Sequence, residues 1–127
     1  MKGRPLHERL GFAFQGLLTG WRREHSFRAH CFMALMVLVA MIMVRPPPVW
    51  WALVAIVVGL VFAFELFNSA MEALIDLLHP GVHPEIKVIK DMLSGAVLTT
   101  GIVAVMVGVA LLVAQAPIFL RDWGVLR

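Results

Sequence analysis

Residues 46–64 read PPPVWWALVAIVVGLVFAF, and residues 65–76 continue the same stretch as ELFNSAMEALID. The first part holds no charged residue. At about 1.5 Å per residue it is just long enough to cross the hydrocarbon core of a bilayer, which is about 30 Å thick. The second part carries polar residues at helical intervals. The whole stretch therefore predicts a membrane-spanning helix that continues as a polar helix at one face of the membrane.

Two further apolar runs flank this helix. Residues 26–44 carry Arg28 near one end, where its long side chain can reach the headgroup region, and residues 92–120 are uncharged throughout. The prolines at 46–48 end the first run, because proline lacks the backbone donor that a helix needs. We expect an all-α membrane protein, a single integral-membrane domain over residues 1–127, with spans at about 26–44, 48–78 and 90–116.

The composition of the chain excludes a soluble globular domain. Hydrophobic residues make up 61% and charged residues 15%, whereas soluble domains hold roughly 45–50% and about 25%. The mean hydropathy of +0.87 points to a chain whose solvent is largely lipid. The net charge of +3 gives no support for nucleic-acid binding, and a single cysteine cannot form an intrachain disulfide.

The segment before the first span, at about 4–23, is predicted to be an amphipathic helix on the membrane surface. Its charges run throughout and it has no early apolar core, so it does not resemble a cleaved signal peptide. The spacing Gly16-x-x-x-Gly20 is interpreted as incidental. The apolar residues that recur on one helical face are Leu6, Leu10, Ala13, Phe14, Leu17, Leu18 and Trp21.

The distribution of basic residues predicts the orientation in the membrane. With three spans, one side receives the N-terminal segment and the loop at about 77–90, which together hold eight Lys and Arg residues. The other side receives three: Arg45, Arg121 and Arg127. Because basic residues accumulate in cytoplasmic loops, we expect a cytoplasmic N-terminus and a C-terminus outside.

The polar part of the second span requires a functional explanation. At roughly 100° per residue, Glu65, Asn68, Glu72 and Asp76 fall within an arc of about 80° on the helix surface. Carboxylates partly at membrane depth cost several kcal/mol unless they face partners, water or a metal ion. A purely structural hydrogen-bonding role is the alternative, and a functional site is the interpretation that we favour.

The topology brings further polar residues to the same membrane face. Glu24 precedes the first span and Lys90-Asp91 opens the third, both on the predicted cytoplasmic side. Clustered carboxylates suit Mg²⁺, which prefers oxygen ligands and usually keeps water or phosphate in its coordination shell. A lysine and the N-terminus of a helix suit phosphate. Together these features suggest phosphoryl transfer to the hydroxyl of a lipid.

The motifs Glu65-Leu-Phe-Asn-Ser-Ala-Met-Glu72-Ala-Leu-Ile-Asp76 and Lys90-Asp91-Met-Leu-Ser94 resemble the signature of the small prokaryotic diacylglycerol kinase family. In the N-terminal segment Gly16-Leu17, Trp21, Glu24 and Phe27-Arg28 stand at matching positions. The resemblance covers about residues 5–110. It implies an inner-membrane, multi-pass kinase that acts as a homotrimer, uses Mg²⁺ and ATP, and phosphorylates diacylglycerol to phosphatidic acid or, in some members, undecaprenol.

The resemblance also implies roles for individual residues. Glu65 is expected to be the catalytic general base that takes the proton of the lipid hydroxyl, and Glu24 and Glu72 are expected to bind the metal. The lipid substrate is expected to contact Glu65, Trp21 and Ser94, with Asn68 and Asp76 in support. The residues expected at the nucleotide are Glu24, Glu72, Gly81, Val82, His83, Lys90 and Asp91.

Several alternatives remain open at this stage. Undecaprenol is the alternative acceptor, because residues 24–30 resemble the form seen in undecaprenol kinases. A small oligomeric ion or proton transporter is the alternative from another class, although the polar stripe stops halfway across the membrane. A non-catalytic assembly subunit would leave Glu24 and Lys90 without an evident purpose. A zinc site at His79 and His83 is disfavoured by the intervening Pro80-Gly81.

Overall fold

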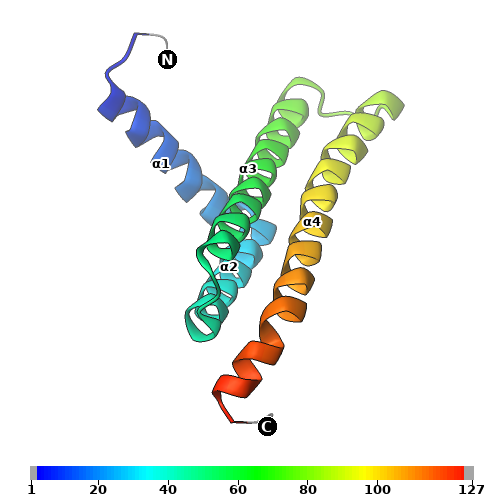
Figure 1. Ribbon diagram of the computed structural model, residues 1–127. Helices are drawn as coiled ribbons and strands as arrows, with labels where there is room; N and C mark the ends of the chain where they lie inside the picture. Colours follow the sequence, from blue (N-terminus) through cyan, green and yellow to red (C-terminus); the bar gives the residue numbers. More distant parts are fainter. Residues whose placement is uncertain (1–2, 125–127) are drawn as a thin grey trace.

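The computed structural model describes residues 3–124, and these residues form α-helices and no β-strand. The all-helical fold class is thereby confirmed. The helices follow one another along the chain with short connections (Figure 1). In chain order they are α1 (Leu6–Arg23), α2 (His25–Val44), α3 (Pro48–Leu78) and α4 (Pro84–Asp122).

Within the described residues, three helices are long and apolar enough to cross a membrane: α2, α3 and α4. Helices α3 and α4 have 31 and 39 residues, so at about 1.5 Å per residue they measure about 46 and 58 Å. Both exceed the hydrocarbon thickness of about 30 Å, and their ends therefore extend beyond it. Lys2 and Arg127, which enter the charge count above, lie outside the described residues.

The breaks between helices follow from particular backbone conformations. Glu24, between α1 and α2, is extended with φ −101° and ψ 117°. Arg45 ends α2 in the left-handed region, with φ 49°, and the prolines after it prevent the helix from continuing. Pro48 and Pro84 stand in the first turns of α3 and α4, where their missing donors leave no hydrogen bond unmade.

Helix α4 is longer than the third span predicted from sequence, about 90–116. It begins at Pro84 because His83 caps it: the His83 Nδ1 accepts a hydrogen bond from the Glu85 N–H at 3.2 Å. It continues through Pro117 to Asp122. The additional turns before residue 90 bring the start of α4 alongside the polar end of α3.

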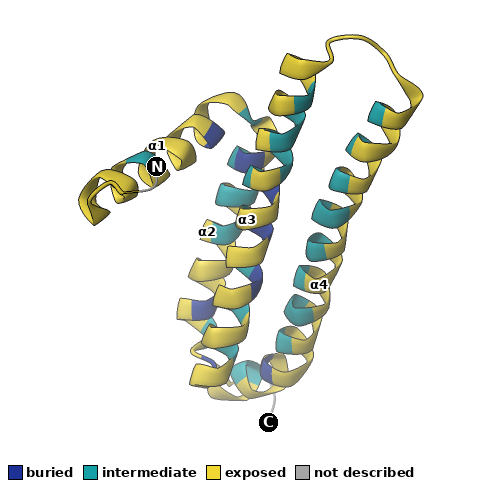
Figure 2. Cartoon of the chain, turned by 90° about the horizontal axis from the view of Figure 1, so that it is seen from above, coloured by how far each residue is buried: buried dark blue, intermediate teal, exposed yellow. Residues whose placement is uncertain are grey.

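Helix α3 lies between α2 and α4 and contacts both (Figure 1). The buried apolar residues among those described belong to α2 and α3 (Figure 2), and Phe27 of α2 packs against Phe62 of α3 with ring centroids 5.3 Å apart. Other large apolar side chains of the spans remain exposed in the single chain. This is the pattern expected where lipid is the solvent, because lipid tails are as apolar as the side chains they meet.

Helix α1 projects away from the other three helices (Figure 1). Its apolar face is not covered by the rest of the chain: Leu6 and Phe14 are 69% and 70% exposed. This exposure is what a helix lying on a membrane surface requires. The other end of α1 is anchored where it meets α2 and α3.

That anchor corrects one interpretation made from the sequence. Gly20 is the buried residue of α1, and a Cβ atom there would lie 2.6 Å from the Leu66 Cδ2 of α3. Glycine at this position lets α1 approach α3 closely, so Gly20 is not incidental. No atom lies within 4 Å of a Cβ placed at Gly16, which has open space around it.

Candidate functional site

Glu65 is a buried carboxylate in the interior of α3. The residue is 4% exposed, and it lies about 26 Å along the helix from Pro48, close to the edge of the hydrocarbon region. Two side chains of α2 meet its two oxygens. The Ser26 Oγ donates a hydrogen bond to Oε1, and the His30 Nε2 lies 3.8 Å from Oε2.

Ser26 and His30 are site residues that sequence reasoning missed. They stand four residues apart on α2, so both project from the same helical face toward α3. The available signal was their polarity at the start of an apolar span, where polar residues usually mark function. The periodicity of α2 does not reveal which residue of α3 they meet, because that depends on how the two helices are rotated against each other.

Asn68 and Glu72 form the next part of the predicted stripe. The Asn68 Nδ2 donates to the Glu72 Oε1 at 3.2 Å. Because a carboxylate only accepts hydrogen bonds, the amide must present its nitrogen there, and its oxygen points elsewhere. That oxygen, Oδ1, is buried and has no hydrogen-bond partner among the described residues.

Glu24 lies at the corner between α1 and α2, and its side chain does not cap α2. It lines a groove of about 600 Å³ between α1 and α3, together with Ser69 and Ala73. Small residues, among them Gly16 and Gly20, leave this space open. Glu72 precedes Ala73 on α3, about 100° around the helix. Glu72 is not among the residues that line this groove, so Glu24 and Glu72 face different sides of α3 in the single chain.

Arg28 holds this corner together. Its Nη1 donates to the carbonyl oxygens of Trp21 and Arg22, at 3.1 and 3.4 Å. These carbonyls belong to the last turn of α1, whose acceptors have no partner within the helix. The guanidinium of Arg28 thus connects the start of α2 to the end of α1 and fixes the angle at which Glu24 is presented.

Two ion pairs lie where α3 and α4 leave the predicted span. The Lys90 Nζ is 2.5 Å from the Asp76 Oδ1, an interaction between α4 and the end of the stripe. The Lys87 Nζ is 2.7 Å from the Asp91 Oδ2 within α4. Lys90 and Asp91, expected at the nucleotide, thus each have a partner of opposite charge in this structure.

The remaining predicted residues are exposed, and none of them forms a hydrogen bond with Glu65. The Ser94 hydroxyl donates to the Lys90 carbonyl within α4, and Trp21 is 48% exposed. Gly81, Val82 and His83 belong to the connection between α3 and α4 and line a shallow hollow of about 500 Å³. The structure joins Glu65 to α2, Asn68 to Glu72 and Asp76 to α4.

The donor atoms available to a magnesium ion can be judged from these contacts. Within residues 3–124 no group of three or more His, Cys, Asp or Glu side chains forms a ready-made metal site. The Glu72 carboxylate, which accepts a hydrogen bond from the Asn68 Nδ2, and the Glu24 carboxylate offer oxygen atoms, the ligands Mg²⁺ prefers. Mg²⁺ usually takes only one or two protein carboxylates and completes its shell with phosphate and water, so these residues fit it.

The fold and the site define an all-helical membrane protein with a buried carboxylate near the membrane boundary. Comparison with known proteins then identifies its family. Residues 11–112 match the family described as prokaryotic diacylglycerol kinase. The chain belongs to this family, and it is a lipid kinase.

Curated relatives carry two different names. The chain is 30% identical to undecaprenol kinase of Bacillus subtilis over 96 residues, which cover 76% of this chain and 78% of that protein. It is 33% identical to a diacylglycerol kinase of Synechocystis over 102 residues, 80% of this chain and 58% of that protein. It is 34% identical to diacylglycerol kinase of Escherichia coli over 95 residues, 75% and 78% of the two chains. No solved structure matches the chain.

Proposed function

We propose that this protein transfers the γ-phosphoryl group of Mg²⁺-bound ATP to the hydroxyl of a membrane lipid, with diacylglycerol as acceptor and phosphatidic acid as product. The observation that carries the proposal is the buried Glu65 carboxylate, to which the Ser26 hydroxyl of a second helix donates a hydrogen bond. The names of the relatives support the same chemistry.

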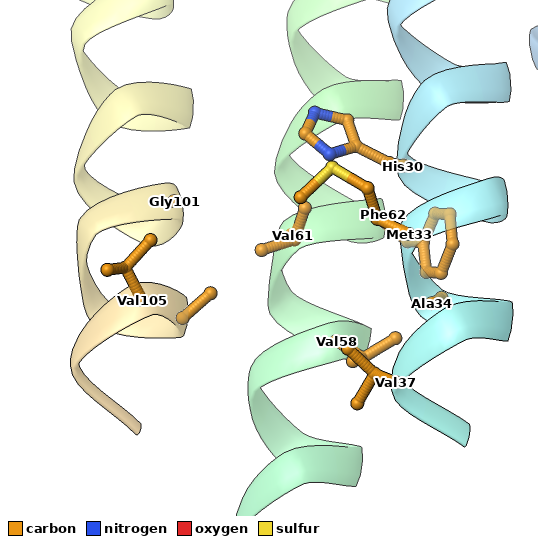
Figure 3. A pocket seen from close by; sticks show the side chains of 10 residues that line it. His30, Met33, Ala34, Val37, Val58, Val61, Phe62, Gly101 and Val105 are labelled. Carbon is orange, nitrogen blue, oxygen red and sulfur yellow. The ribbon is translucent and has the colours of Figure 1, made fainter. Parts of the chain in front are cut away.

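Glu65 is the residue to accept the proton of the lipid hydroxyl. A carboxylate near a lipid headgroup can take that proton as the oxygen attacks phosphorus, provided that it lies within hydrogen-bond reach. Ser26 donates to Oε1 and leaves Oε2 for the hydroxyl. An apolar groove of about 260 Å³ lies between α2, α3 and α4 and is lined by His30, Val61 and Gly101 (Figure 3), and His30 is the residue of this groove whose Nε2 faces Glu65.

Glu24 and Glu72 are the residues that would hold Mg²⁺. The ion, when bound, neutralises charge on the transferring phosphoryl group. Glu72 supplies carboxylate oxygens from α3, and the Glu24 carboxylate, which caps no helix, lines the groove between α1 and α3. That groove has space for the phosphates that the ion would accompany.

Lys90 and Asp91 are proposed to contact the nucleotide, with residues 81–83 nearby. An ammonium group attracts phosphate as a point charge. Lys90 is paired with Asp76 at the surface, and exposed ion pairs of this kind are worth only about 0–1 kcal/mol. A polyphosphate, with its greater charge, can therefore attract Lys90 away from Asp76 at little cost.

Orientation and assembly belong to the same proposal. We place the N-terminus in the cytoplasm and the C-terminus outside the bacterial inner membrane, which puts the connection between α3 and α4 on the side where ATP is found. This agrees with the excess of basic residues on that side. We further propose a homotrimer, in which a neighbouring subunit approaches Trp21 and Ser94, both exposed in the single chain.

The test is a lipid phosphorylation assay with purified protein in detergent micelles. Diacylglycerol and undecaprenol are offered separately with ATP, with and without Mg²⁺. We expect Mg²⁺-dependent formation of phosphatidic acid that exceeds the phosphorylation of undecaprenol. A preference for undecaprenol would show that undecaprenol is the acceptor and would leave the proposed kinase activity unchanged. No product with either lipid, together with ion flux in liposomes, would show a transporter instead.

A further inference from the structure

The two oxygens of the Glu65 carboxylate meet two side chains of different chemistry. The Ser26 hydroxyl uses its single hydrogen to donate to Oε1, so it holds the carboxylate in place and cannot take a proton from it. The His30 imidazole faces Oε2 at 3.8 Å. Imidazole is the side-chain group that both binds and releases a proton near neutral pH.

Because Glu65 is buried, a proton that it accepts needs a route by which to leave. The Glu65 side chain is 5% exposed, whereas that of His30 is 27% exposed. A base that has taken the proton of a lipid hydroxyl must lose it before the next turnover. The Glu65 carboxylate is almost fully covered, and His30 is the titratable group whose Nε2 lies beside it.

The surroundings of His30 leave Glu65 as its proton-exchange partner. Figure 3 shows the His30 imidazole extending from α2 into the space between the helices. From α3, the titratable group that faces it is Glu65, and the α4 residues that line the same groove are Gly101, Ala104 and Val105, which do not titrate. The other residues that line this groove are apolar. A proton on Glu65 thus has one titratable neighbour among the described residues.

We propose that His30 is a positioning and proton-accepting residue for Glu65 and carries the proton of each turnover away from the buried carboxylate. The inference rests on the proposed function, because it takes Glu65 to be the base. The lipid oxygen bonds to the γ-phosphorus, its O–H bond breaks, and the proton goes to Oε2. The bond from that phosphorus to the bridging oxygen breaks, and its electrons leave with ADP.

In the second step the proton moves from Oε2 to the Nε2 of neutral His30, and the imidazolium then releases a proton to water. Glu65 returns to the ionised form, and the net product is one proton, so no further reactant is required. A separation of 3.8 Å is longer than a hydrogen bond. Such contacts are often long without substrate and tighten when it binds.

The experiment compares H30Q and H30A with the wild type in the lipid phosphorylation assay. Gln at position 30 keeps a hydrogen-bond donor for Oε2 but cannot take up a proton. We expect kcat to fall about 10²-fold in H30Q, the lower end of what proton transfer by a side chain contributes, with KM for lipid and ATP nearly unchanged. H7Q makes the same chemical change on the exposed α1 and should keep the wild-type kcat.

Rescue by a small base separates proton transfer from a structural role. Imidazole added at constant pH and ionic strength should raise the kcat of H30A in proportion to its concentration and should leave E65Q inactive. Pyrazole, which has the same shape but is far less basic, should not rescue. Size-exclusion chromatography checks that each variant keeps the wild-type assembly.

Two results would overturn the inference while leaving the kinase intact: wild-type kcat in H30Q, or equal rescue of H30A by imidazole and pyrazole. The first would show that no proton passes through His30, and the second that the imidazole only fills space. A wild-type protein that phosphorylates no lipid would instead remove the proposed function, and this inference with it. The two failures are therefore distinguishable in one set of assays.

Discussion

Ser26 of α2 donates a hydrogen bond to Glu65 of α3, a residue 39 positions later in the chain. The bond holds a buried carboxylate of one membrane span against the start of another. It joins the segment that follows the α1–α2 corner to the polar stripe of α3. The position of Glu65 is therefore tied to the position of that corner, where Glu24 lies.

The hydroxyl of Ser26 can be tested by removing it. S26A leaves the Glu65 Oε1 buried without a donor, and hydrogen bonds to charged groups are worth about 1.5–3 kcal/mol. We expect a lower Tm and about a tenfold or greater loss of kcat. A misplaced Glu65 carboxylate raises the activation free energy, and each increase of about 1.4 kcal/mol slows the reaction tenfold. S26T keeps the hydroxyl and should recover most of both. Equal Tm and kcat in S26A and the wild type would contradict this role.

Substitutions of Glu65 and Glu72 are expected to affect turnover and nucleotide binding differently. E65Q removes the proposed base while leaving the oxygen atoms near Glu72 intact, so turnover should drop by about 10² or more with nucleotide binding nearly unchanged. E72Q removes a proposed metal ligand and should weaken binding of Mg²⁺-ATP as well. Fluorescent-nucleotide titration beside the activity assay measures both quantities. Equal loss of nucleotide binding in the two variants would refute this division of roles.

The close approach at Gly20 gives a matched pair of variants. G16A and G20A gain the same helix propensity, about 1 kcal/mol, and differ in what the new methyl group meets. At Gly16 it meets open space, whereas at Gly20 it lies 2.6 Å from the Leu66 Cδ2. Overpacking of this kind typically costs about 1–3 kcal/mol. G20A should therefore have the lower Tm and activity of the two.

The clash at Gly20 also predicts a rescue. L66A removes the atom that the new methyl group meets, so G20A/L66A should regain part of the activity lost in G20A. Thermal unfolding in detergent and the lipid phosphorylation assay provide the measurements. If G20A and G16A behave alike, the contact between α1 and α3 does not control the site.

Lys90 should act on nucleotide affinity more than on stability. Its pair with Asp76 is partly exposed, so K90Q should change the free energy of unfolding by less than about 1 kcal/mol. The loss of a positive charge beside phosphate should raise the KM for ATP. Salt should raise the KM of the wild type more than that of K90Q, because screening weakens exposed charges. R121Q removes a positive charge at the far end of α4 and should leave the KM unchanged.

The helices themselves were predictable from the sequence because a backbone in lipid must satisfy its own hydrogen bonds, which leaves helices as the form for long apolar runs. The prolines after Arg45 and after His79 mark where the runs end. Figure 1 shows the resulting helices, with α2, α3 and α4 side by side and α1 projecting away from them. Helix α4 is longer than the third predicted span, since the cap at His83 lies before the apolar run begins.

Part of the candidate site was also visible in the sequence. Glu65, Asn68, Glu72 and Asp76 share a face because of the 3.6-residue period, and the Asn68–Glu72 bond follows from their spacing of four. The proposed roles of Glu24 and Glu72 at a metal remain predictions. The interpretation of the Gly16-x-x-x-Gly20 spacing as incidental was wrong for Gly20, which closely approaches Leu66 of α3, whereas Gly16 has open space around it.

The sequence by itself determined the number of helices, their membrane character and the polar stripe, because hydropathy and periodicity are properties of one segment at a time. The tertiary structure decided that Ser26 and His30 meet Glu65, that Lys90 meets Asp76 and that Gly20 meets Leu66. These contacts depend on the rotation and offset of one helix against another. Side-chain packing between helices sets the rotation and the offset, and the periodicity of a single helix predicts neither of them.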